Sequence, residues 1–182
     1  MSRVQLLDAT TAPLTARRYY QNGDPGPLVG ALATVPELLE VSMPFLAAVL
    51  GPSALDARTK EIVIVRTSAL LRCGYCVDTH SVVALDTGLT IGEVHALRGE
   101  SAAVLADQRE NALLGWVDVV AGGRGPVGDE VGRRLGRYFA EHETVELTLL
   151  VGVTMMLNRF CTALDLPTSP EVVRRLAAAG LR

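Results

Sequence analysis

Aromatic side chains are scarce in this chain and make up 4% of its 182 residues. An aliphatic core of this kind favours helices packed on helices. Charge is also sparse and nearly balanced, with 17 Lys and Arg against 20 Asp and Glu and a net charge of -3. Because no excess of positive charge is available for a polyanion, we expect no nucleic-acid partner.

Cysteine is rare as well, with 3 residues in the chain. That number is too small for a framework of disulfides, and it leaves redox or metal chemistry for the two cysteines that are closely spaced. No apolar run reaches the roughly 18 residues that span a bilayer, so we expect no membrane helix. The first residues contain no apolar stretch of signal-peptide length, which predicts a cytoplasmic protein.

Hydrophobic residues, by contrast, are plentiful: they make up 49% of the chain, and the mean hydropathy is +0.29. A chain of this length and composition is expected to fold around one core. Apolar surface in excess of that core is usually covered by another subunit. The composition therefore predicts a homo-oligomer.

No stretch shows the alternation of a strand, so the sequence predicts an all-α chain. Pro and Gly punctuate residues 1–35, which we interpret as an irregular arm with at most a short helical turn, and residues 36–182 as a single all-helical domain. Pro44 is expected to kink or break the first helix. Two helices are apolar nearly all round, which indicates burial. The predicted helices cover about 36–50, 56–72, 74–86, 90–99, 103–121, 128–141, 144–164 and 170–180, the second and seventh being the two buried ones.

The most informative stretch is Cys73-Gly74-Tyr75-Cys76, followed four residues later by His80. On a helix, the two thiols and the imidazole lie within a stripe about 60° wide and so share one face. A thiolate is the reactive form of cysteine, and a helix N-terminus with a second thiol nearby lowers the pKa of a thiol. His80 can take the thiol proton. These three residues are therefore candidate catalytic groups.

Glu61 is the candidate carboxylate for orienting His80, because its side chain leaves a mostly apolar helix surface, which is unusual for a solvated Glu. On one straight helix it would lie roughly 18 Å from Cys73, so contact with His80 requires a chain reversal close to Gly74. Two alternatives stay open. The cysteines could be ordinary buried core. They could also bind zinc with His80 and Glu61, although a second, distant pair of ligands is missing.

We also predict the roles of four other residues near the motif or in the apolar helices. Cys161 lies in an apolar helix and is expected to be inert core. Tyr75 is expected to be a packing residue, although its hydroxyl could border the thiols. Asn158 and Arg159 fall within a helix predicted to be buried, so both need partners, and we expect structural or interface roles for them.

At the residues Glu61, Cys73, Cys76 and His80 the chain resembles the alkyl hydroperoxidase D branch of the carboxymuconolactone decarboxylase-like superfamily. That branch carries a Glu, a C-x-x-C twelve residues later and a His four residues after the second Cys. The resemblance covers roughly residues 35–165. One position departs from it: well-understood peroxidases of the branch have a His just before the second Cys, where this chain has Tyr75.

The resemblance implies an all-α fold, assembly as homotrimers or homohexamers, and reduction of small alkyl hydroperoxides through a dithiol/disulfide cycle. It implies that Cys76 is the peroxidatic thiolate, that Cys73 is the resolving thiol, and that His80 and Glu61 form a proton relay. Such a cycle needs an external dithiol reductant, lipoyl or thioredoxin-like, and no bound cofactor.

Two other functions stay open. One is a carboxymuconolactone decarboxylase-type enzyme acting on a small carboxylic acid or lactone, but such relatives work without the cysteine pair. The other is a non-enzymatic redox sensor or scaffold whose dithiol reports oxidation to a partner.

Overall fold

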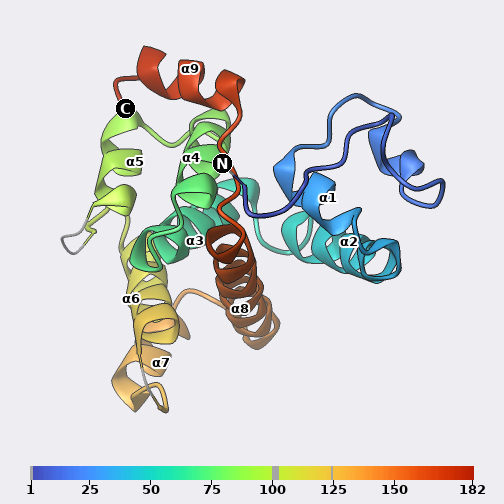
Figure 1. Ribbon diagram of the computed structural model, residues 1–182. Helices are drawn as coiled ribbons and strands as arrows, with labels where there is room; N and C mark the ends of the chain where they lie inside the picture. Colours follow the sequence, from blue (N-terminus) through green and yellow to red (C-terminus); the bar gives the residue numbers. More distant parts are fainter. Residues whose placement is uncertain (1, 100–102, 124) are drawn as a thin grey trace.

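The computed structural model describes residues 2–99, 103–123 and 125–182, and every regular element within them is a helix (Figure 1). The predicted all-α fold is confirmed. Helix α3 lies at the centre, and α4, α5, α6 and α8 pack against it. In chain order the α-helices are α1 (Pro27–Leu32), α2 (Pro36–Leu50), α3 (Ala57–Leu70), α4 (Gly74–Asp86), α5 (Ile91–Arg98), α6 (Gln108–Gly122), α7 (Asp129–Leu135), α8 (Glu141–Ala163) and α9 (Pro170–Ala178).

Three helices begin at side-chain caps that lie at or next to their predicted first residues. Asp56 Oδ1 accepts a hydrogen bond from the backbone N–H of Thr59 at 2.7 Å and so starts α3. Thr90 and Glu93 form a reciprocal capping box at α5, and the Ser169 hydroxyl caps α9. Each cap satisfies backbone donors that have no partner within their own helix.

Helix α3 is covered on all sides by its own chain. Ile62, Val63, Ile64 and Val65 are successive residues that point in different directions, and all are buried. Burial of the whole circumference agrees with the prediction from an apolar pattern without a polar face. Helix α3 therefore forms the axis around which the other helices are placed.

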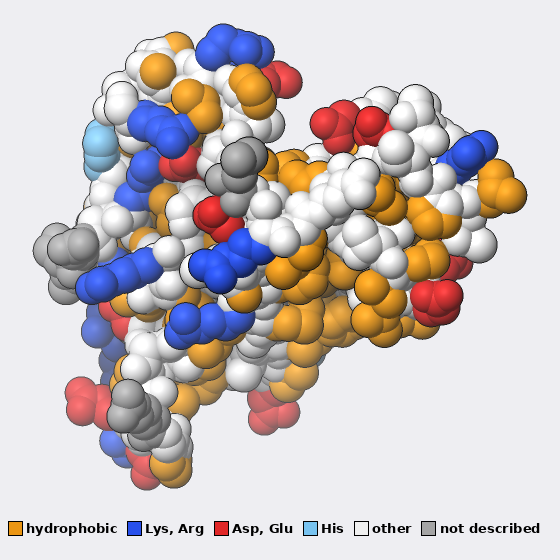
Figure 2. Space-filling view, viewed as in Figure 1, with side chains coloured by type: hydrophobic (Ala, Val, Ile, Leu, Met, Phe, Trp, Pro, Cys, Tyr) orange, Lys and Arg blue, Asp and Glu red, His pale blue; other side chains and the backbone are white. Residues whose placement is uncertain are grey.

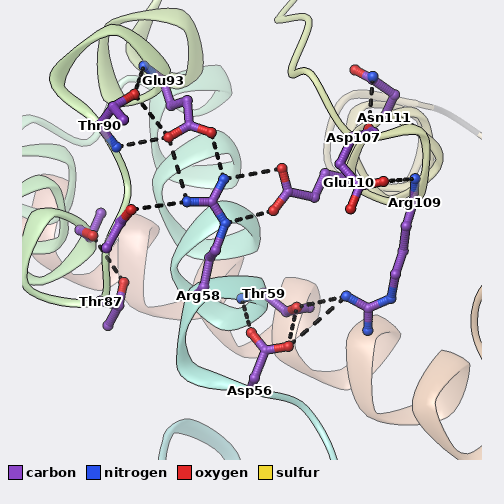
Figure 3. Close-up of polar contacts among 12 residues, drawn as sticks. Asp56, Arg58, Thr59, Thr87, Thr90, Glu93, Asp107, Arg109, Glu110 and Asn111 are labelled. Carbon is purple, nitrogen blue, oxygen red and sulfur yellow. Dashed lines mark hydrogen bonds and ion pairs between the residues drawn. The ribbon is translucent and has the colours of Figure 1, made fainter.

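Arg58 joins the first turn of α3 to two neighbouring helices (Figure 3). Its Nε lies 2.6 Å from a Glu110 carboxylate oxygen on α6, and its Nη2 lies 2.5 Å from Glu93 on α5. The hydrogen bond from Arg58 is the main cause that holds the pKa of Glu93 at about 2. One guanidinium between two carboxylates thus fixes the register of three helices.

Helix α8 differs from its prediction as a buried element. Leu147, Leu150 and Val151 are buried, but Val145, Leu149 and Met156 are 69%, 47% and 51% exposed. Figure 2 shows hydrophobic side chains gathered over the region of α2 and α8. By length and composition α8 would also qualify as a membrane span, although it packs against α3, α4 and α6, with 39% of its most apolar window buried.

Helix α2 keeps its predicted bounds, whereas the boundaries of two other helices differ from their predictions. Helix α2 continues through Pro44 without a break. Helix α6 begins at Gln108, because Asp107 caps it, and not near residue 103. Helix α7 ends at Leu135, six residues earlier than expected, where Gly136 provides the C-cap.

The N-terminal arm contains more helix than expected, because a 3-10 helix (Arg17–Tyr20) and α1 both lie within residues 1–35. It is also fastened to the domain: the backbone N–H of Arg3 donates to the carbonyl oxygen of Leu164 at 2.9 Å. Gly30 lies so close to Leu7 that an added Cβ would be 3.1 Å from the Leu7 carbonyl oxygen. The arm therefore packs tightly against the end of α8.

Candidate active site

A tight turn between α3 and α4 creates the site. Arg72 has a φ of 56°, in the left-handed region that is uncommon for residues with side chains. The backbone N–H of Cys73 donates to the carbonyl oxygen of Ser68 at 3.0 Å. Cys73 is the N-cap of α4 and Gly74 its first residue. The chain reversal required for Glu61 to reach His80 is therefore present.

The two thiols of the C-x-x-C motif meet at the start of α4. The sulfur atoms of Cys73 and Cys76 are 3.0 Å apart, and both residues are buried, with 1% and 6% of their surface exposed. This separation is longer than the 2.05 Å of a disulfide bond. The structure therefore shows a reduced pair of free thiols in hydrogen-bonding contact.

Glu61 on α3 reaches His80 on α4, as the sequence predicts. The His80 Nδ1 lies 3.0 Å from the Glu61 Oε2, with 26% of the imidazole and 9% of the carboxylate exposed. A carboxylate at Nδ1 holds the proton there and leaves Nε2 as the nitrogen available for proton transfer. Glu61 also lines a cavity of about 400 Å³ with Val83 and Thr87, which continue the helix face of the cysteines and His80.

Helix α8 supplies a third thiol: Cys161 lies in the core, as the sequence predicts, but its neighbours there include both cysteines of the motif. Cys161 is buried at 2% exposure and shares a hydrophobic cluster with Cys73 and Cys76. Hydrogen bonding that involves Cys161 contributes to the pKa shifts of both cysteines of the motif. The pattern of Cys161 within its own apolar helix carried no signal of this contact, because the three thiols come from two helices far apart in the sequence.

Asn158 and Arg159 lie in different environments in the structure. Asn158 is buried, and its Nδ2 donates to the Ser68 hydroxyl at 2.9 Å, which is the structural role predicted. Asn158 also contributes to lowering the pKa of Cys76, and its Oδ1 has no hydrogen-bond partner among the described residues. Arg159 is exposed, so the expectation that it lies within a buried helix is wrong. Sequence reasoning thus missed Asn158 as a residue of the site.

The pKa values of the three thiols are shifted in different directions. Hydrogen bonds from Cys161 and then Cys76 lower the pKa of Cys73, and the backbone N–H of Cys76 adds to this effect. The hydrogen bond with Cys161 lowers the pKa of Cys76, but its hydrogen bond to Cys73 and its burial raise that pKa by more. The pKa of Cys161 is raised by the same two neighbours. Cys73, at the N-terminus of α4, is therefore the thiol of the three whose pKa is lowered.

The N-terminal arm covers the thiols. Ala31 of α1 belongs to the cysteine cluster, and Val4, Leu6 and Leu28 pack against it. Tyr75 packs there too, as predicted, and burial raises its pKa to about 12. A cavity of about 730 Å³ lies between the arm, Tyr75 and the segment before α9. The arm was expected to be separate from the site, but its residues pack over the thiols and line this cavity.

The zinc alternative can be compared with the geometry. Among the described residues, no group of three or more His, Cys, Asp or Glu side chains has an arrangement that would hold a metal ion. Glu61 is bound to Nδ1 of His80, while the thiols contact one another. The four residues therefore form a thiol group and an imidazole–carboxylate pair, not one ligand set.

Two solved structures share the fold of this chain. Over 94% of both chains, it matches an alkylhydroperoxidase AhpD core, a peroxidase-related protein of Ralstonia eutropha, with a TM-score of 0.83 and 16% identity. It also matches the debrominase Bmp8 over 98% of both chains, with a TM-score of 0.79 and 18% identity. The chain therefore has an AhpD-like helical fold.

Sequence comparison finds similarity to one family over just under half of the chain. Residues 36–119 match the carboxymuconolactone decarboxylase family. The YnjA protein of Escherichia coli is 25% identical over 115 residues, which span 63% of each chain. Residues 36–119 are thus similar to this family, and the fold is AhpD-like.

Proposed function

We propose that the protein is a thiol-dependent peroxidase or disulfide reductase that reduces small hydroperoxides, alkyl hydroperoxides among them, with Cys73 and Cys76 as its redox pair. The observation that carries the proposal is the pair of free sulfurs 3.0 Å apart. Its support is the His80–Glu61 contact from the same helix face. Two thiols at this distance can lose two electrons together with little movement of the backbone.

Cys76 attacks the hydroperoxide in this proposal, although Cys73 is the thiol whose pKa is lowered. A proton moves from the Cys76 sulfur to the Cys73 sulfur across their hydrogen bond of 3.0 Å. That transfer creates a thiolate at Cys76, four residues before His80, and a thiol at Cys73. The same transfer leaves Cys73 protonated for the next step.

The first chemical step forms a sulfur–oxygen bond between Cys76 and the distal oxygen of the hydroperoxide while the O–O bond breaks. The leaving alkoxide takes a proton through His80 and departs as an alcohol, and Cys76 becomes a sulfenic acid. Cys73 then attacks the Cys76 sulfur. A disulfide forms, and the displaced hydroxide takes the Cys73 proton and leaves as water.

An external dithiol, lipoyl or thioredoxin-like, restores the pair by thiol–disulfide exchange in this proposal. The burial of both sulfurs implies that the reductant or the arm must shift to expose the disulfide. A homotrimer or homohexamer is the assembly that we propose, on the basis of the exposed apolar face of α8. No bound organic cofactor enters either half of the cycle.

Thiol counting tests the proposal directly. One equivalent of cumene hydroperoxide should remove two free thiols per chain, and dihydrolipoamide should restore them and support turnover. The Cys73→Ser/Cys76→Ser double variant should do neither. An unchanged thiol count in the native protein, or equal consumption of hydroperoxide by the double variant, would contradict the proposal. Thiol loss without turnover by any dithiol would favour the redox sensor instead.

Reductive debromination is a second candidate, favoured by the similarity to Bmp8, which has been solved with 2,3,4-tribromopyrrole. The same pair would supply two electrons: bromide and a proton leave, hydrogen replaces bromine on the ring, and the disulfide forms. Bromide release from tribromopyrrole by the reduced protein would support this candidate. A decarboxylase would instead keep its activity on a carboxylated lactone in the double variant.

A further inference from the structure

Cys161 is a thiol that the proposed dithiol cycle does not use. It lies on α8, far along the chain from the C-x-x-C motif, yet it shares one buried cluster with Cys73 and Cys76. Hydrogen bonding with these two cysteines is also the main cause that raises the pKa of Cys161. A buried cysteine without reactive neighbours is usually inert. A thiol that is buried beside a redox pair can instead react with an oxidised sulfur of that pair.

The position of Cys161 is firmly held. One turn earlier on α8, Asn158 donates to Ser68 of α3 at 2.9 Å, which sets the rotation of α8 about its axis. One turn later, the backbone N–H of Leu166 donates to the carbonyl oxygen of Cys161 at 3.0 Å. These two hydrogen bonds hold the backbone of α8 on either side of Cys161, and the thiol itself is buried, with 2% of the residue exposed.

We propose that Cys161 is the third thiol of the redox centre and a second resolving residue, able to form a disulfide with either cysteine of the pair. The sulfenic-acid step rests on the proposed function. When Cys76 carries a sulfenic acid and Cys73 is absent, the Cys161 sulfur attacks the Cys76 sulfur. The S–O bond breaks, the S–S bond forms, and hydroxide leaves with the Cys161 proton as water.

This assignment changes what a single substitution should show. With two thiols alone, Cys73→Ala would leave a sulfenic acid on Cys76 without a partner, open to trapping by dimedone or to over-oxidation. With Cys161 in contact, the same variant still closes a disulfide, now between α4 and α8. A third thiol thereby protects the nucleophile from irreversible oxidation whenever its usual partner is occupied.

Peptide mapping separates the two disulfides, because trypsin places the pair and Cys161 in different peptides. Cleavage after arginine yields residues 73–98 with both cysteines of the pair and residues 160–174 with Cys161. A Cys73–Cys76 disulfide stays within one peptide, whereas any disulfide to Cys161 joins two. In the Cys73→Ala protein treated with one equivalent of cumene hydroperoxide and dimedone, the joined peptides should be the major product.

The matched control adds Cys161→Ser to that variant, which keeps a small polar side chain and removes the thiol. The dimedone adduct on Cys76 should then replace the joined peptides. A dimedone adduct of equal yield with and without Cys161, with Cys161 still open to alkylation, would overturn the proposal. Native-like circular dichroism of each variant is checked first, and Cys73→Ser serves as the second variant if the alanine protein does not fold.

Diamide, which oxidises thiols directly, separates this inference from the peroxidase proposal. Both Cys73→Ala and Cys76→Ala should yield the joined peptides with diamide, through Cys76 and Cys73 respectively. A diamide cross-link in a protein that never reacts with hydroperoxide would overturn the peroxidase and keep Cys161 as a disulfide partner. A Cys73–Cys76 disulfide formed by hydroperoxide, without any joined peptide under either oxidant, would overturn only the role of Cys161.

Discussion

Helices α3 and α8 have the same kind of sequence and different surroundings. Apolar residues fall on all sides of both, and each has a face against the thiol centre, with Glu61 and Ser68 on α3 and Asn158 and Cys161 on α8. Helix α3 is covered on every side by its own chain. Helix α8 is covered on one side and leaves Val145, Leu149 and Met156 exposed on the other.

The difference shows that apolar residues on all sides of a helix predict burial. They do not show whether the same chain or another subunit covers each side. The uncovered face of α8 borders a cavity of about 720 Å³ that Phe45 and Trp116 also line. An apolar surface of this kind commonly marks an interface. The homo-oligomer expected from composition stays a prediction, and this face is where we expect its subunits to meet.

The largest expected effect is on stability, and it tests whether the two helices really differ. Ile62→Ala on α3 removes a fully buried side chain and should lower the free energy of unfolding by about 2–5 kcal/mol. Leu149→Ala on the exposed face of α8 should cost less than about 0.5 kcal/mol in a monomer. Urea unfolding monitored by circular dichroism measures both. Equal losses at low protein concentration would show that the two helices do not differ.

The second effect concerns the side of α3 that faces the thiols. Glu61→Gln and His80→Ala should each slow oxidation of Cys76 by hydroperoxide, on the order of a hundredfold for loss of a general acid–base group. His95→Ala is the matched control, because His95 is exposed on α5. Stopped-flow measurement of thiol loss gives the rates. A His80→Ala rate equal to that of His95→Ala would remove the relay from the mechanism.

The third effect concerns the outer side of α8. Leu149→Arg places a charge within the exposed apolar face and should dissociate a homotrimer or homohexamer formed there. The helix content should stay unchanged, because the side chain at this position is 47% exposed within one chain. Sedimentation or light scattering at micromolar concentration measures the assembly. A native protein that is monomeric under these conditions would contradict the interface from the outset.

The smallest effect is a pH dependence at the N-terminal end of α3. The pKa of Glu93 is lowered from 4.5 to about 2, mainly by the hydrogen bond from Arg58. A carboxylate with a lowered folded-state pKa stabilises the protein above its unfolded pKa, and that contribution is lost as the pH falls from 4.5 toward 2. Glu93→Gln should therefore flatten the decline of the melting temperature across that range. Glu130→Gln, an exposed control on α7, should leave the decline unchanged.

Local signals in the sequence determined much of the molecule. Side-chain caps such as Asp56 and Thr90 begin their helices where predicted, because a cap and the backbone donors it satisfies lie within one turn. The shared face of Cys73, Cys76 and His80 follows from helix geometry alone. The Glu61–His80 contact needed only one reversal next to Gly74, and the structure has it.

The tertiary structure alone decided the rest of the site. Cys161 and Asn158 reach the thiols from α8, and Ala31 covers them from the arm, although each is distant in the sequence from the C-x-x-C motif. Periodicity shows that a residue such as Cys161 faces a core, but not which side chains it meets there, because that depends on how α8 packs across α3 and α4. The exposed side of α8 has the same cause: packing within the chain covered one face of an apolar helix and left the other uncovered.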